Sequence, residues 1–223
     1  MPQAHLKDPC MRPEQVTNWL GEARFRAYLE ASAGEHERAV ALYNWNAKIS
    51  AAFLEIISHL EVLFRNSIDR QFDATDPDIP LTILSPEPWL CDPTLLTVES
   101  RERVNEAISR LQRERKPPTR DRVVASLSFG FWQALFSGVY EDLWRTRLSS
   151  AFPHGTGRRR EVARLSGPIL HFRNRIAHHE AIFSSDLRAR HRQISTLAGI
   201  IDPEAARYIE EISRVEKLLL EMP

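Results

Sequence analysis

The sequence has little cysteine and little glycine, and each shortage excludes a class of protein. Its two cysteines, Cys10 and Cys91, are far apart and form no CxxC pair, so neither a disulfide framework nor a structural zinc site is expected. Glycine occurs only 8 times, and the chain contains no Gly-rich phosphate loop, no GxGxxG and no GxSxG. It therefore lacks the motifs of a P-loop NTPase, a Rossmann dinucleotide-binding domain and an α/β-hydrolase.

Net charge and long apolar segments are missing as well. Lys plus Arg and Asp plus Glu number 30 each in 223 residues, so the formal net charge is +0, which excludes a polycation that coats nucleic acid by bulk charge. No apolar run approaches the roughly 20 residues that span a bilayer, and the chain does not begin with a basic segment followed by an apolar one. We therefore expect a cytoplasmic protein with no membrane partner. With 43% hydrophobic residues, the chain can form one domain over residues 1–223.

The spacing of the apolar residues predicts an all-α fold. These residues recur at steps of three and four, and the alternation typical of strands is hard to find. No Pro or Gly interrupts residues 35–72, which predicts one long central amphipathic helix. Five X-Pro pairs within residues 73–96 predict a Pro-rich loop insertion, with Trp89 and Leu90 packed onto the core. Further helices are expected over residues 24–33, 97–114, 129–136, 140–152, 158–177, 186–197 and 203–220.

Basic residues are concentrated in one part of the sequence. Residues 145–192 contain eleven arginines but only three acidic residues. One interpretation is a local face for a polyanion such as RNA, since a guanidinium binds phosphate oxygens bidentately. The other is a surface whose charge is compensated by acids that folding brings beside it. The candidates for RNA phosphate contacts are Arg158, Arg159, Arg160 and Arg164, and a solvated helix start is the alternative for this run.

The densest group of polar functional residues is the string Arg-Asn-Arg-Ile-Ala-His-His-Glu at residues 173–180. Asn174 and His178 are four apart, so they share a face of a helix. Arg175 lies three residues before His178, and Arg173 lies a turn and a half before it. One helix end can therefore gather an imidazole, an amide and one or two guanidinium groups.

That set of groups suits phosphodiester cleavage in RNA. An imidazole titrates near pH 6.5, so His178 can take the proton of a ribose 2′-OH or supply one to the leaving oxygen. A guanidinium such as that of Arg173 can stabilise the charge that develops on the phosphate. Attack by the 2′-OH forms a 2′,3′-cyclic phosphate and requires no metal. Two copies of the site facing each other across a dimer would supply both a base and an acid.

Two simpler interpretations of the histidines compete with this one. A His near the C-terminus of a helix is often only a cap that interacts favourably with the helix dipole. The triplet His178-His179-Glu180 also resembles a metal-binding fragment. However, adjacent side chains on a helix point about 100° apart and seldom share one ion, and the sequence has no HExxH. No metal and no cofactor are therefore expected.

Residues 173–178 resemble a known pattern, the Arg-x4-6-His motif of the HEPN superfamily. The longer string at 172–183 looks like the signature of the Abi-like (abortive infection) branch of that superfamily. Four segments in this order are more specific than Arg-x4-His alone, and the resemblance covers roughly residues 20–220. The three other similar segments are Ala-Leu-Tyr-Asn-Trp-Asn at 41–46, Leu-Glu-Val-Leu-Phe-Arg-Asn at 60–66 and Leu-Ser-Phe-Gly-Phe-Trp at 127–132.

The resemblance implies a HEPN-like helical bundle that forms a homodimer, with the motifs meeting in a shared cleft. It also implies a metal-independent endoribonuclease that acts in phage defence (abortive infection) or as a toxin, with an antitoxin or regulatory protein as a further partner. The expected catalytic residues are Arg173 and His178, with Asn174 as the polar residue after the arginine. The expected substrate is single-stranded or loop RNA, whose 2′-OH is accessible.

Six further residues are expected to assist or to line the site: Arg175, His179, Glu180, Glu61, Arg65 and Asn66. For the last three, the alternative is a buried Glu61–Arg65 pair at i, i+4 that holds the bundle together. Gly167-Pro168 predicts a kink or break shortly before the motif, which affects the reach of Arg173.

Two other functions compete with the nuclease. One is a non-catalytic RNA-binding or regulatory helical module, and the other is a helical interaction protein in which the motif is only a helix cap and a dimer contact. The aromatic residues within 129–136 are expected in the core rather than as a platform for RNA bases.

Overall fold

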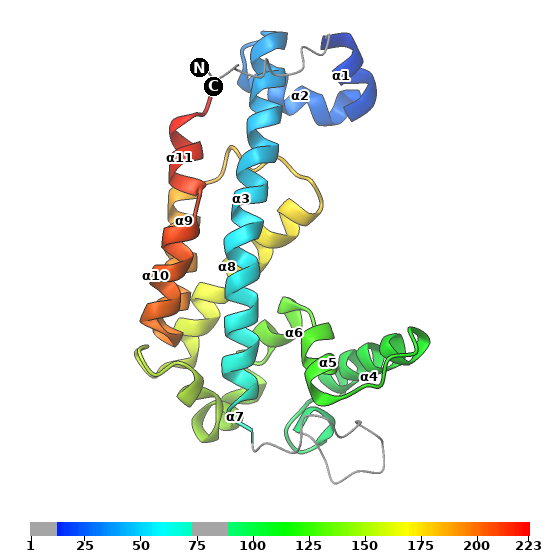
Figure 1. Cartoon of the computed structure of the whole chain (residues 1–223), viewed down its shortest axis with the longest axis vertical. Helices are drawn as coiled ribbons and strands as arrows, with labels where there is room; N and C mark the ends of the chain where they lie inside the picture. Colours follow the sequence, from blue (N-terminus) through cyan, green and yellow to red (C-terminus); the bar gives the residue numbers. More distant parts are fainter. Residues whose placement is uncertain (1–12, 73–88) are drawn as a thin grey trace, which may run out of the picture.

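The computed structural model of the chain describes residues 13–72 and 89–223. Within these residues every regular element is helical and no strand occurs, which confirms the all-α prediction (Figure 1). Single turns of 3-10 helix are η1 (Trp89–Cys91), η2 (Gly138–Tyr140) and η3 (Leu148–Ala151). The α-helices are α1 (Pro13–Leu20), α2 (Glu22–Ala31), α3 (His36–Asp69), α4 (Val98–Arg113), α5 (Arg120–Ser126), α6 (Phe129–Ala134), α7 (Glu141–Thr146), α8 (Arg159–Ala177), α9 (Leu187–Ile201), α10 (Pro203–Ile212) and α11 (Val215–Leu220).

The longest helix, α3, forms the centre of the fold (Figure 1). It has 34 residues, which corresponds to a length of about 50 Å. Ile49, Phe53, Ile56 and Leu60 are fully buried at the three- and four-residue steps expected of an amphipathic helix. Helices α8 and α9 pack against its middle, α10 and α11 along one side, and α1 and α2 at its N-terminal end. The prediction of one long helix over residues 35–72 is confirmed to within three residues at each end.

Aromatic rings fill the core around the C-terminal end of α3. The ring of Phe64 lies with its centroid 5.4 Å from that of Phe129, 5.5 Å from Phe136 and 5.7 Å from Phe152. Trp132 is also buried, at 1% exposure. The aromatic residues within 129–136 therefore belong to the core, as expected. They are not available to stack on RNA bases.

Buried polar contacts hold the two ends of the Pro-rich segment together. The Trp89 indole stacks on Phe72 with a centroid distance of 4.0 Å and donates to Asp69 Oδ1 at 2.8 Å. The guanidinium of Arg120, itself 6% exposed, also donates to that carboxylate. Trp89 and Leu90 are both buried, as predicted. Residues 73–88 of the predicted loop lie outside the described residues, and residues 92–96, which follow η1, contain no helix or strand.

Helix α8 is continuous from Arg159 to Ala177 and contains Pro168. A proline removes the N–H that would bond to the carbonyl four residues earlier, which here is the carbonyl of Arg164. The side-chain amide of Gln193 on α9 donates to that carbonyl at 3.2 Å instead. The predicted break at Gly167-Pro168 is therefore wrong, because a neighbouring helix supplies the missing donor.

Helices α4 and α5 extend away from α3 on the side toward which α1 and α2 extend at the other end (Figure 1). The C-terminal end of α8 and the chain that follows it lie between these two regions. Within residues 13–72 and 89–223, no helix combines the length and the apolar composition needed to cross a membrane.

Candidate functional site

The predicted motif lies across the end of α8, which the backbone terminates with a left-handed turn. The N–H of Glu180 bonds to the carbonyl of Arg175 and the N–H of His179 bonds to the carbonyl of Ile176, both at 2.9 Å. His179 has a φ of 56°. These bonds form a Schellman motif, which satisfies carbonyls that a helix end otherwise leaves without donors. His178 is the last residue before this turn, and its side chain is exposed.

A left-handed conformation is unfavourable for residues with a Cβ, but it is not specific to this site. Helices α2 and α4 end in the same way, with Ala33 at φ 52° and Arg115 at φ 56°. In both cases the next residue donates its N–H to a carbonyl five positions earlier. The turn at His179 therefore shows how this chain ends helices and is not evidence of strain for catalysis.

Arg175 holds the segment that follows the turn. Its Nε donates to Glu180 Oε2 at 3.0 Å, its Nη1 donates to Ser185 Oγ at 2.9 Å, and its Nη2 donates to the carbonyl of Ala181. Three N–H donors of Arg175 are thus used by residues 180–185 of the same chain. The geometry assigns Arg175 and Glu180 to shaping the loop after α8.

Two residues from distant parts of the sequence also hold this loop. Asn46 on α3 is 5% exposed, and its Oδ1 accepts the N–H of Ile182 at 2.8 Å. Arg24 on α2 donates from Nη1 to the carbonyl of His179 at 3.0 Å. Sequence reasoning missed both residues. The signal for Asn46 was an amide on the otherwise apolar face of the long helix.

Arg173 forms an ion pair with the central helix. Its Nε donates to Glu61 Oε1 at 3.2 Å, with side-chain exposures of 38% and 25%. The structure thus pairs Glu61 with Arg173 and not with Arg65, whose Nη1 instead donates to the carbonyl of Ala125 at 3.3 Å. Asn66 is five positions after Glu61, about 140° around the helix, and lines a separate hollow between α3 and α10. Of the three predicted residues of α3, only Glu61 contacts the motif.

Arg173 and His178 lie on different faces of α8. Five helical positions separate them by about 140°, and Arg173 faces α3. His178 instead continues an exposed row formed by Arg160, Arg164 and His171, at helical steps of four, seven and seven. One copy of the chain therefore does not present the two side chains on the same surface.

The arginines at the start of α8 differ in their surroundings. Arg159 is 13% exposed and donates from Nε to Glu141 Oε2 at 2.7 Å and from Nη1 to the carbonyl of Phe136. It joins α8 to the region around α7 and is not a free phosphate ligand. Arg158, Arg160 and Arg164 are exposed. Thirteen helical residues, or about 20 Å, separate Arg160 from Arg173, so the run is not part of the motif site.

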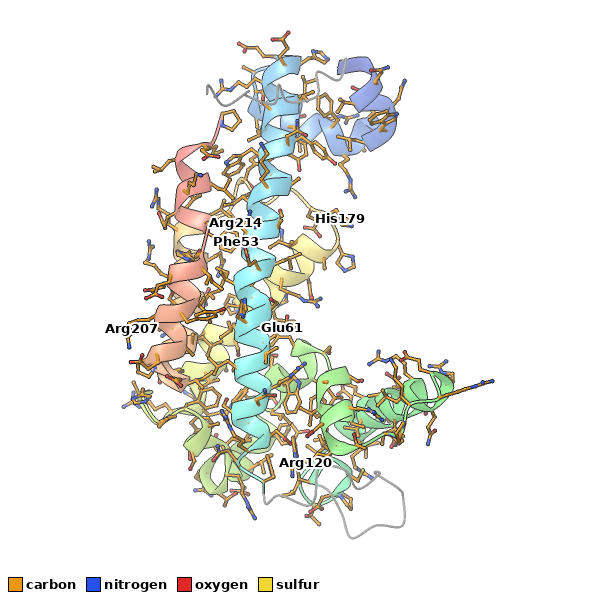
Figure 2. The ribbon with its side chains drawn as sticks, viewed as in Figure 1. Phe53, Glu61, Arg120, His179, Arg207 and Arg214 are labelled. Carbon is orange, nitrogen blue, oxygen red and sulfur yellow. The ribbon has the colours of Figure 1, made fainter. Side chains whose placement is uncertain are left out.

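A groove of about 640 Å³ lies beside the end of α8. One wall of the groove is α2, and its floor is α3. The other wall is the end of α8 with the turn at His179, a residue labelled in Figure 2. Burial raises the pKa of Tyr28, which lines the groove, to about 12. The lining residues are Arg24, Tyr28, Tyr43, Asn46, Ala47, Ser50, Ala51, Leu54, Ile176, Ala177, His179 and Glu180.

Among the described residues, no group of three or more His, Cys, Asp or Glu side chains is placed to hold a metal ion. The chemistry that the site offers is that of an exposed imidazole, an oriented guanidinium and a rigid loop. Comparisons of this chain with protein-family models, with curated proteins and with solved structures found no match.

Proposed function

We propose that this protein is a metal-independent endoribonuclease of the Abi-like HEPN type, with a composite active site formed by two copies of the chain. The observation that carries the proposal is the construction of the motif. His178 is exposed at the end of α8, Arg173 is oriented by Glu61, and the loop between them and α9 is held by Arg175, Asn46 and Arg24. Such fixed placement is what a catalytic site needs.

The roles follow from the chemistry of each group. His178 exchanges protons with the ribose 2′-OH or the leaving 5′-oxygen. Arg173 keeps donors beyond the Nε that Glu61 occupies, because a guanidinium carries five N–H groups, and these stabilise the charge on the phosphate. Asn174, half-buried beside the turn, orients the phosphate. Glu61 acts as a positioning residue for Arg173.

A second copy is required because one chain points Arg173 and His178 to different sides. In a symmetric dimer, a cleft between the two copies can receive side chains from both of them. Val62, the residue after Glu61 on α3, is 44% exposed, and an exposed apolar side chain there suits a contact between copies. RNA would approach along the exposed Arg160 and Arg164 at the start of α8. The setting implied by the resemblance is phage defence or a toxin controlled by a partner protein.

The test is cleavage of labelled single-stranded RNA in EDTA by the wild type and by His178→Ala. The matched control is His171→Ala, since His171 is an exposed histidine on the same row of α8. We expect the wild type and His171→Ala to leave 2′,3′-cyclic phosphate ends and His178→Ala to leave RNA intact.

Two outcomes would overturn the proposal. If all three proteins cut equally, the activity belongs to another site or a contaminant. If the wild type binds RNA without cutting it, the non-catalytic RNA-binding module is the better account, and the Arg173–Glu61 pair would then be a structural contact.

A further inference from the structure

The side-chain amide of Asn46 lines the groove beside the motif and has an unused donor. The N–H of Ile182 requires an acceptor, so the Oδ1 of Asn46 faces it at 2.8 Å, and the NH₂ group must point the other way. This NH₂ group donates to none of the groups in residues 13–72 and 89–223, although Asn46 is only 5% exposed and lines the groove. The NH₂ group is not among the fully buried polar atoms that lack a partner, so it is open to the groove, and an acceptor atom of a ligand can bond to it.

Two aromatic rings form the wall of the same groove. Tyr28 and Tyr43 meet edge to face, with centroids 5.4 Å apart and an interplanar angle of 83°. Tyr28 is fully buried, whereas Tyr43 is half-buried. Burial raises the pKa of Tyr28 to about 12, further above neutral pH than the ordinary value of a tyrosine. The half-exposed ring of Tyr43 offers a surface on which a flat ligand can stack.

The rest of the groove has an apolar floor of small side chains and the guanidinium of Arg24 at its edge. Ala47, Ala51 and Leu54 present small or apolar side chains from α3. The exposed Arg24 uses Nη1 for the carbonyl of His179, which places its charge one residue from His178. A flat ring with acceptor atoms and an attached anion matches these features, and a volume of about 640 Å³ lies in the range of small-molecule sites.

We propose that the groove between α2, α3 and the end of α8 binds one nucleotide of the RNA, next to the phosphate that is cleaved. The base stacks on Tyr43 and accepts a hydrogen bond from the Asn46 amide, and the phosphate of that nucleotide contacts Arg24. This inference rests on the proposed function for the identity of the ligand as RNA. It adds a base-reading subsite that would decide where the RNA is cut.

The experiment measures binding separately from cleavage. The probes are the four ribonucleoside 5′-monophosphates and a 2′-O-methyl hexanucleotide, which has no 2′-OH and cannot be cut. Ala51→Trp fills the groove from an exposed position, and Thr196→Trp places the same side chain on an exposed position of α9 outside the groove. Asn46→Asp keeps an acceptor for Ile182 and removes the amide donor. Calorimetry gives the affinities, gel filtration gives the oligomeric state, and circular dichroism confirms folding.

We expect Ala51→Trp to weaken binding of the probes at least 10-fold and Thr196→Trp to leave it unchanged. Asn46→Asp should change the order of preference among the four nucleotides. His178→Ala should bind the probes like the wild type while losing cleavage, which separates this inference from the proposed function. If Ala51→Trp binds as the wild type does, the groove is not a nucleotide subsite. A change in oligomeric state with unchanged binding would assign the groove to the contact between copies and would equally overturn the inference.

Discussion

The tripeptide Phe-Arg-Asn occurs twice, at residues 64–66 on α3 and at 172–174 on α8, with different surroundings. Both phenylalanines are buried, and both arginines reach a neighbouring helix or turn. The guanidinium of Arg65 donates to the neutral carbonyl of Ala125, whereas that of Arg173 donates to the carboxylate of Glu61. Helix α3 continues to Asp69, but α8 stops at Ala177 and exposes His178. The comparison teaches that the helix end and the charged partner, and not the tripeptide, mark the candidate site.

The largest expected effect separates the two arginines in catalysis. Arg173→Ala should lower the cleavage rate by about 10³-fold, a loss typical of removing a donor to a developing negative charge. Arg65→Ala should change the rate less than about 10-fold, because the side chain of Arg65 donates to the backbone carbonyl of Ala125, away from the motif. Single-turnover cleavage measures both. Equal losses in the two variants would remove the distinction between the two copies of the tripeptide.

The two phenylalanines should differ in stability. Phe64→Ala is expected to lower the free energy of unfolding by about 4–5 kcal/mol, at the upper end for such changes, because its ring contacts Phe129, Phe136 and Phe152. Phe172→Ala should cost about 3 kcal/mol, since within residues 13–72 and 89–223 its ring meets one aromatic ring, that of Phe53. Urea unfolding gives both values. A larger loss at Phe172 would show that the core centres on α8 instead.

The ion pair at Arg173 should matter more for the rate than for stability. Glu61→Gln should lower the cleavage rate about 10-fold, because the guanidinium loses its charged partner. It should change the unfolding free energy by less than about 1 kcal/mol, as expected for a partly exposed pair. Glu55→Gln is the matched control, because Glu55 also lies on α3 and pairs with Arg214, at the start of α11, at 2.8 Å. A rate loss shared by both variants would contradict the positioning role.

The smallest effect concerns the continuity of α8 past Pro168, since α3 contains no proline. Gln193→Ala leaves the carbonyl of Arg164 without its donor and should cost about 0.5–1 kcal/mol. In a Pro168→Ala background the backbone N–H returns, so the same change should cost almost nothing. A double-mutant cycle in thermal unfolding measures this coupling. Identical costs in both backgrounds would mean that Gln193 does not compensate for the proline.

Much of the fold was predictable because helical periodicity reports directly on burial. The long central helix, the buried Trp89 and Leu90, and the aromatic core around residues 129–136 all follow from patterns within short segments. The continuity of α8 was not predictable, because the donor that replaces the N–H of Pro168 comes from Gln193 on another helix. A local rule cannot contain that information.

The candidate site was predictable only as a cluster of residue types. The string at 173–180 was found from its density of polar groups, and its place at a helix end was expected. That Arg175 binds the following loop, and that Arg159 is held by Glu141, were not expected. An arginine side chain is long and flexible, so its partner depends on which acid or carbonyl the fold brings within reach.

The sequence by itself determined the helical class, the position of the long helix and the polar string at the end of α8, since these depend on spacing along the chain. Tertiary structure alone decided that Glu61 meets Arg173, that Asn46 and Arg24 hold the turn at His179, and that a groove opens beside it. Those contacts join residues more than 110 positions apart. The contacts of Asn46 and Glu61 exist because burying the apolar face of α3 places these two residues against the end of α8 and the loop that follows it.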